Sequence, residues 1–220
     1  MTGLLAKAAV GLIASTGAAL GPAAAASAAL PNQPAGASER GPLVNAHFET
    51  IDPSGCLVTD TFVSANSGVT HDHPSTPEAG PVNDVEVSVY EYDACNDFAS
   101  LVDAAGLVTT LPAGAFTVSN QLDAAHLVAD VPLDDLVSGT TITVHVDVTW
   151  TGTSTITRDH ANTNDRYSRD CHVLNRWKGS GRTADAAGSV SNATTDFTPA
   201  PTHDGEIGKV IDGFEVIGCF

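Results

Sequence analysis

The sequence of 220 residues predicts an all-β fold, a two-sheet antiparallel β-sandwich with long loops. In several segments apolar and polar residues alternate with a period of two, which is typical of a strand that is half buried in a sheet. Short apolar stretches are separated by turn residues such as Pro112-Ala113-Gly114 and Ser138-Gly139. Only residues 97–105 and 133–137 have a pattern that fits a helical turn.

The clearest predicted strand spans residues 141–150, where the apolar side is formed by Ile142, Val144, Val146, Val148 and Trp150. Residues 85–90 and 126–133 alternate in the same way. Further strands are expected at residues 43–51, 56–64, 106–111, 115–119, 154–158, 185–191 and 210–219. Because no Trp lies between Cys56 and Cys95, the predicted sandwich is a non-standard immunoglobulin-like one.

The N-terminus has the pattern of a secretory signal. A start with one charge at Lys7 precedes an apolar run over residues 8–20, and Ala26-Ser27-Ala28 fits a cleavage site. That run is shorter than the roughly 20 residues that a membrane-spanning helix needs. The sequence therefore predicts a signal peptide over residues 1–28, a flexible leader over 29–42 and one secreted domain over 43–220, with no membrane span in the mature chain.

The composition limits the class of partner. The chain is 42% apolar, which is enough for a packed core, and its formal net charge is -17. A charge of this sign excludes nucleic acid and anionic membranes as main partners, and it also fits an adaptation for solubility in a salty medium.

Basic residues are concentrated in one segment. Residues 29–157 contain 17 acidic residues and one basic residue, Arg40, whereas six basic residues lie in the 25 residues from Arg158 to Arg182. Two interpretations remain open for residues 158–182. The segment either packs across the acidic sheets through ion pairs, or forms a ligand-facing loop that includes Tyr167 and Trp177.

The four cysteines, Cys56, Cys95, Cys171 and Cys219, predict two disulfides in an exported chain. Three pairings are possible. We favour Cys56 with Cys95 and Cys171 with Cys219, because each pair would join a strand end to a nearby region. A zinc site is the alternative, but the sequence has no Cys-x-x-Cys pair.

Several stretches are similar to a known group of proteins. They are VEVSVYEYDAC at residues 85–95, GAFTVSNQLDAAHLVADV, VSGTTITVHVDVTWTGT and the closing EVIGCF. Together they resemble a family of uncharacterised secreted bacterial β-rich proteins, over residues 43–220. The resemblance implies secretion and a single domain, and it implies no activity, cofactor or catalytic residue.

Two kinds of metal site are candidates. His71 and His73, with Glu78 nearby, offer ligands for a transition metal, although they lie in a loop rich in Pro, Ser and Gly. Calcium is the possible cofactor of an acidic extracellular protein, because it prefers oxygen ligands. Its candidate sites are the pair Asp134 and Asp135 and a loop with Asp159, Asn162, Asn164 and Asp165, and neither has EF-hand spacing.

The functional hypothesis is a secreted, non-enzymatic binding or scaffold module for a cell-wall polysaccharide or an extracellular protein. Tyr90 and Tyr92 share a strand face with polar residues, as in sheets that bind carbohydrate or protein, although they could instead cover a sheet edge. The candidate ligand-binding residues are Tyr90, Tyr92, Tyr167, Trp177, Arg166, Arg169 and Arg176.

The alternative is an extracellular hydrolase or metal-dependent enzyme. His145 and Asp147 share a strand face and could act as a base and its orienting partner, or His71 and His73 could hold a metal. The sequence contains neither a Gly-x-Ser-x-Gly elbow nor a His-Glu-x-x-His zinc motif. An enzyme is therefore the less favoured hypothesis.

Overall fold

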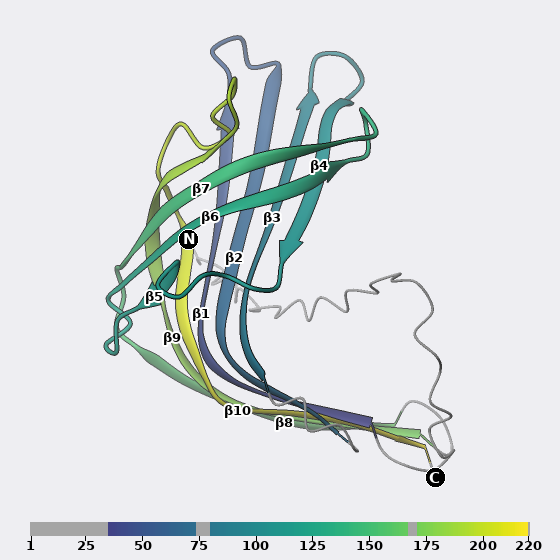
Figure 1. Ribbon diagram of the computed structural model, residues 1–220, viewed down its shortest axis with the longest axis vertical. Coiled ribbons are helices and arrows are strands. Elements are labelled where there is room, and N and C mark those ends of the chain that lie inside the picture. The colour runs from purple at the N-terminus through teal and green to yellow at the C-terminus, as the bar shows by residue number, and fades with distance from the viewer. Residues whose placement is uncertain (1–34, 74–79, 167–170, 220) are drawn as a thin grey trace, which may run out of the picture. The chain divides into compact units, whose positions relative to one another are not determined.

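The part of the chain that the structure describes forms ten antiparallel strands, which Figure 1 labels. The computed structural model describes residues 35–73, 80–166 and 171–219. Within these ranges no helix is long and apolar enough to cross a membrane. The strands are β1 (Ala35–Ile51), β2 (Leu57–His73), β3 (Gly80–Asp93), β4 (Ala99–Val108), β5 (Phe116–Val118), β6 (Ala124–Asp135), β7 (Thr140–Gly152), β8 (Thr157–Arg166), β9 (Cys171–Ser191) and β10 (Thr202–Cys219).

The strands form one hydrogen-bonded sheet in the order β10-β1-β2-β3-β4-β6-β7-β9-β8, with β5 paired to β6. Because β9 also pairs with β10, the order of strands returns to its start. Only two residue pairs join β4 to β6, Ala104 with Asp135 and Ala105 with Asp134. At this short junction the sheet changes layer, so a single sheet supplies both faces of the all-β sandwich that the sequence predicts.

The predicted alternation is confirmed in the core strands. Every second residue of β7 from Val144 to Trp150 is completely buried, and the residues between them are exposed. β6 and β7 cross over β1, β2 and β3 (Figure 1). The core between these layers contains Val44, Ala46, Phe48, Val63, Ala65, Val85, Val87, Val89, Leu127, Val131, Leu133, Val144, Val146, Val148 and Trp150.

Trp150 connects the two layers directly. Its indole is completely buried, and its Nε1 donates a hydrogen bond of 2.7 Å to the carbonyl oxygen of Asn45 in β1. β9 and β10 contribute smaller residues beside it, and a Cβ built on Gly205 would lie 3.3 Å from the indole Cδ1. A small residue at position 205 therefore leaves room for the largest side chain of the core.

The pairing of β1 with β2 is interrupted at Gly41 and Pro42. Gly41 has a φ of +149°, and a Cβ at this position would lie 2.0 Å from the carbonyl oxygen of Ser67. Gly68 has the same restriction, because its Cβ would lie 1.9 Å from the oxygen of Arg40. The two backbones cross too closely for side chains here, which makes both glycines necessary.

Three segments differ from the sequence-based expectations. Residues 99–105, expected as part of a helical turn, lie in β4, where Ala104 is buried against the core. β6 extends to Asp135, so the other predicted helical turn is a strand end followed by a tight turn. Residues 35–42 of the predicted leader form the start of β1, because they pair with both β2 and β10. The described residues of the segment 158–182, for which the sequence left both a packed segment and a ligand-facing loop open, belong to the paired strands β8 and β9.

Candidate functional site

Four aromatic side chains lie near one another on the outer face of β2 and β3 and in the turn after β3, and we call them the aromatic row: Phe62, Tyr90, Tyr92 and Phe98. The ring centroids of Tyr90 and Tyr92 are 5.3 Å apart, and those of Tyr92 and Phe98 are 5.8 Å apart. Phe62 lies opposite Ser88, one diagonal step from Tyr90 on the same face. The exposed fraction is 38% for Phe62 and 66% for Phe98. Tyr90 is exposed as well and Tyr92 is half-buried, so the row presents three exposed rings and one that is partly covered.

Strand alternation turns Tyr90 and Tyr92 outward. Val85, Val87 and Val89 take the inward positions of β3 and are completely buried or nearly so, which leaves the even-numbered residues on the outer face. The Tyr90 hydroxyl is 2.9 Å from the Ser100 Oγ of β4, so a hydrogen bond holds the ring across the strand pair. The sequence-based prediction of an aromatic strip at these two tyrosines is therefore matched by their positions.

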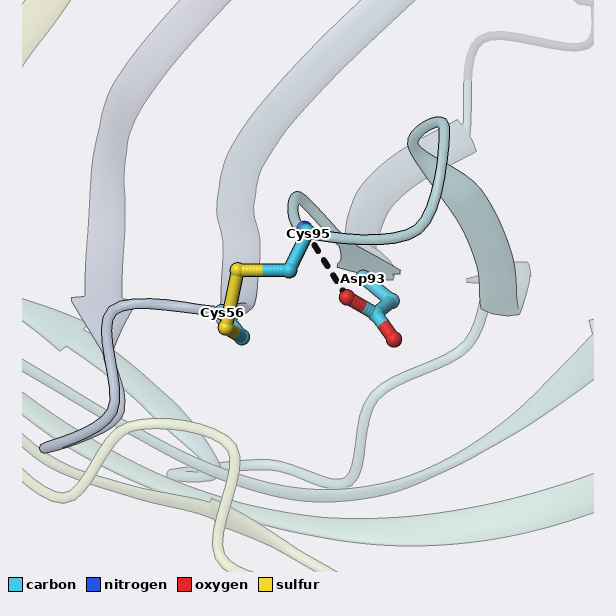
Figure 2. A group of neighbouring side chains, drawn as sticks. All are labelled: Cys56, Asp93 and Cys95. Carbon is cyan, nitrogen blue, oxygen red and sulfur yellow. Dashed lines mark hydrogen bonds between the residues drawn. A yellow bond between two sulfur atoms is a disulfide. The ribbon is translucent and has the colours of Figure 1, made fainter.

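The turn after β3 brings Phe98 to the row. Asp97 and Phe98 both have positive φ values, 52° and 55°, which reverse the chain within a few residues. The Asp93 carboxylate accepts a hydrogen bond of 2.9 Å from the Cys95 amide (Figure 2). This turn, which the sequence did not reveal, places the Phe98 ring against Tyr92.

A disulfide fixes the same turn. Cys56, just before β2, is bonded to Cys95, with the two Cα atoms 5.0 Å apart (Figure 2). The Ala94 amide also donates to the Cys56 carbonyl at 2.7 Å. This disulfide confirms one of the two predicted pairings. The sulfurs and the Asp93 carboxylate lie within 4.8 Å of one another, but sulfurs joined in a disulfide are not the thiolates that zinc binds.

Carboxylates lie on both sides of the aromatic row. Three acids lie on one line that crosses the strands through Tyr90. Asp60 of β2 and Asp103 of β4 are the two cross-strand neighbours of Tyr90, and Glu49 of β1 is opposite Asp60. We call these three acids the carboxylate line. His47 is 3.3 Å from the Asp60 carboxylate. Residues directly opposite in an antiparallel pair have Cβ atoms about 5 Å apart, so the acids border the Tyr90 ring.

The basic residues of β8 and β9 are far from the aromatic row. The cross-strand partner of Trp177 is Gly213 of β10. Successive partners across β1 and β2 are Glu39 and Thr70, and the last is Gly80 at the start of β3. Tyr90 is ten residues further along β3, which corresponds to about 33 Å of strand at about 3.3 Å per residue. The structure thus separates Tyr90 and Tyr92 from Trp177 and Arg176, which the hypothesis had grouped together.

Alternation also divides the basic segment itself. Arg176 is opposite Asn162, and Lys178 is opposite His160, whereas Trp177 is opposite Ala161. Neighbouring residues of a strand face opposite sides, so Trp177 does not share a face with Arg176 and Lys178. The indole covers Gly179, where a Cβ would lie 2.5 Å from the ring. A cavity of about 460 Å³ is lined by this part of β8 and β9 together with Ile211.

Other predicted site residues are described only in part. Tyr167 and Arg169 lie outside the described residues, and Arg166 is the last residue of β8. His71 and His73 belong to β2, paired with Ser38 and Gly36, rather than to a loop, since the β1–β2 ladder continues to this point. Cys171 and Cys219 are cross-strand partners in β9 and β10. A disulfide between these two cysteines stays a prediction.

The proposed catalytic pair does not form. His145 Nδ1 is 2.8 Å from the Asp130 carboxylate, and Asp147 is 2.9 Å from His126 Nε2, so each residue pairs across to β6 instead. Ser191 of β9 is in register with His145, but no hydrogen bond joins its hydroxyl to that ring among the contacts of the described residues. Both His–Asp pairs are exposed on the sheet surface, and within the described part of the chain the two rings contact carboxylates rather than a hydroxyl that they could activate.

The candidate calcium residues have structural partners. Asp134 accepts a hydrogen bond from the Thr141 hydroxyl at 2.9 Å. Asp135 is buried and accepts from the Ser138 hydroxyl at 2.6 Å and from the amides of Asp103 and Val137. The residues of the other candidate site, 159–165, lie along strand β8 rather than in a loop. Asp135 therefore organises the β6–β7 turn and its contact with β4.

The hydrogen bond from the Ser138 hydroxyl is the main reason why the pKa of Asp135 is lower than usual, and partial burial opposes it. Because the pKa of Asp135 is lower in the folded state than in the unfolded chain, its ionised carboxylate stabilises the fold at pH values above about 3.9, the ordinary pKa of Asp. This stabilisation is lost as the pH falls below that value and reaches the lowered pKa of the folded state. We expect Asp135→Asn to lower the urea midpoint at pH 7 and the difference from wild type to shrink below about pH 4. Asp134→Asn is the matched control, and a difference that does not change with pH would contradict this role.

Comparison with known proteins gives no family assignment: no protein-family model matches the chain, and no curated protein matches it significantly. The aromatic row thus has to be interpreted from its own geometry. Sequence reasoning found Tyr90 and Tyr92 but missed Phe62 and Phe98. Phe62 had a signal, because it occupies an outward position between Thr61 and Val63 in a predicted strand.

Proposed function

We propose that the protein is a secreted, non-enzymatic module that binds an extracellular polysaccharide through the aromatic row. The observation that carries this proposal is the run of solvent-accessible rings in which the centroids of Tyr90, Tyr92 and Phe98 are 5.3 and 5.8 Å apart. Aromatic faces stack on the apolar faces of sugar rings, and successive rings at this spacing give a polymer several points of contact. The N-terminal signal pattern and the disulfide support the extracellular location.

The surroundings of the row favour a polysaccharide over a peptide. β2 and β3 are each hydrogen-bonded on both sides, so an extended peptide has no free strand edge beside the row. The disulfide and the Tyr90 to Ser100 hydrogen bond hold the rings in place before a ligand arrives. Such preorganisation reduces the entropy lost on binding.

Affinity electrophoresis of the purified protein in gels that contain cell-wall polysaccharides tests this function. We expect Tyr92→Ala to weaken binding about tenfold or more, because truncation of a central aromatic contact commonly removes more than about 1 kcal/mol. Tyr92→Phe keeps the ring and should keep the binding. Ile156→Ala, at an exposed residue between β7 and β8, is the control. Retardation that is equal in wild type and Tyr92→Ala would reject the aromatic row as the binding site.

A further inference from the structure

The charge around the aromatic row points to the chemistry of the ligand. Tyr90 lies between Asp60 and Asp103 on one cross-strand line, and Glu49 continues this line onto β1. Asp103 and Glu49 are exposed, and Asp60 is half-buried. An exposed ring bordered by carboxylates attracts a cation twice, through the negative face of the ring and through the charges beside it.

Positive charge is scarce in this half of the chain. Arg40 is the only Lys or Arg residue between residues 29 and 157, and it lies nine positions before Glu49 along β1. His47 is shared between the carboxylates of Asp60 and Asp204. A neutral sugar would offer no opposite charge to Glu49 and Asp103, the two acids of the line that His47 does not contact, and an anionic sugar would be repelled by all three.

We propose that the aromatic row and the carboxylate line together select a polysaccharide that carries free amino groups. This inference rests on the proposed function, since the rings supply the stacking and the acids supply the selectivity. A protonated amine on a sugar stacked at Tyr90 lies within reach of Asp60 or Asp103 on either side. The acids thus act as specificity determinants, and they contribute by charge rather than by contact area.

The test compares two soluble probes of the same length and linkage: a β-1,4-linked glucosamine oligomer, whose amines are free, and its fully N-acetylated counterpart, whose nitrogens are uncharged amides. Binding is measured by calorimetry at low salt, at a pH where the amines are protonated. We expect the amine form to bind about tenfold more tightly, because each exposed ion pair accounts for about a two- to fivefold effect. This preference should decrease as salt screens the charges.

Variants assign the preference to the carboxylate line. Asp103→Asn combined with Glu49→Gln should reduce the ratio of the two affinities about fivefold or more while binding of the N-acetylated oligomer stays the same. Asp103→Asn alone is compared with Asp159→Asn, which removes one exposed carboxylate from β8 and is therefore its matched control for one lost charge. Equal affinity for both probes would overturn the amine selectivity but leave the proposed function intact.

Two further outcomes are decisive. If neither probe binds and no cell-wall polysaccharide is retarded, the proposed function itself is wrong. If the amine form is preferred but Asp103→Asn alone has no greater effect than Asp159→Asn, the preference comes from the overall charge of the protein, and the local site is rejected.

Discussion

Replacement of Trp150 by alanine should lower the free energy of unfolding by about 3–5 kcal/mol, the range measured for loss of a large aromatic side chain from a core. Two losses combine in this variant. The completely buried indole leaves a cavity between the layers, and the hydrogen bond of 2.7 Å to the Asn45 carbonyl disappears. Denaturant unfolding followed by circular dichroism gives the value.

Two further variants separate these contributions. Trp150→Phe keeps most of the apolar volume and loses the indole donor, so its loss of stability should be clearly smaller than that of the alanine variant. Trp177→Ala makes the same large change at a partly exposed position in β9 and should destabilise the fold less. Equal losses at positions 150 and 177 would contradict the role of Trp150 as the link between the layers.

Removal of the Cys56–Cys95 disulfide should cost about 2–5 kcal/mol of stability. The bond joins residues 39 positions apart and closes the region that contains β2, β3 and the start of the following turn. Without it, the unfolded chain gains freedom that the oxidised chain does not have. The measurement is denaturant unfolding of the Cys56→Ser, Cys95→Ser double variant under non-reducing conditions, and an unchanged midpoint would disagree with this expectation.

The same double variant should also affect binding. Cys95 lies in the turn that brings Phe98 to Tyr92, and the Asp93 carboxylate holds the Cys95 amide. Loss of the disulfide leaves this turn with hydrogen bonds alone, so the Phe98 end of the aromatic row should become less ordered. We therefore expect polysaccharide in the gel to retard the double variant less than the wild-type protein, even without denaturant, where the variant is folded.

The core strands could be predicted from the sequence because their burial is one-sided. In β7 every inward position from Val144 to Trp150 is apolar and every outward position is polar, so the period of two is unbroken. The Cys56–Cys95 pairing followed from similar reasoning about strand ends. Local pattern and tertiary burial agree in these segments, which is the condition under which sequence reasoning succeeds.

The failures have the opposite cause. The burial of β4 alternates from Val102 to Val108, but its sequence does not show this period, because the apolar residues Leu101 and Leu107 take exposed positions. The sequences of β8 and of the first part of β9 are rich in polar residues and show no clear period of two. Only their pairing identifies them as strands, because β8 pairs with β9 and β9 pairs with β10. Local propensity is overridden by tertiary pairing in these segments.

The aromatic row could be predicted only in part for a geometric reason. Tyr90 and Tyr92 are two residues apart on one strand, and alternation alone puts them on the same face. Phe62 joins them through the β2–β3 register, and Phe98 joins through a turn with two positive φ values. Neither relation is encoded in the spacing of residues along the chain.

The pairing of β1 with β10 has a consequence for how the chain acquires its structure. Residues near position 45 contact residues near position 206, so the β1–β10 ladder cannot form until residues up to about position 206 have been synthesised. Contacts between such distant segments make folding slow. The ladders of β2 with β1 and with β3 join neighbouring segments and can form earlier, so the sheet closes only when β10 has been made and pairs with β1.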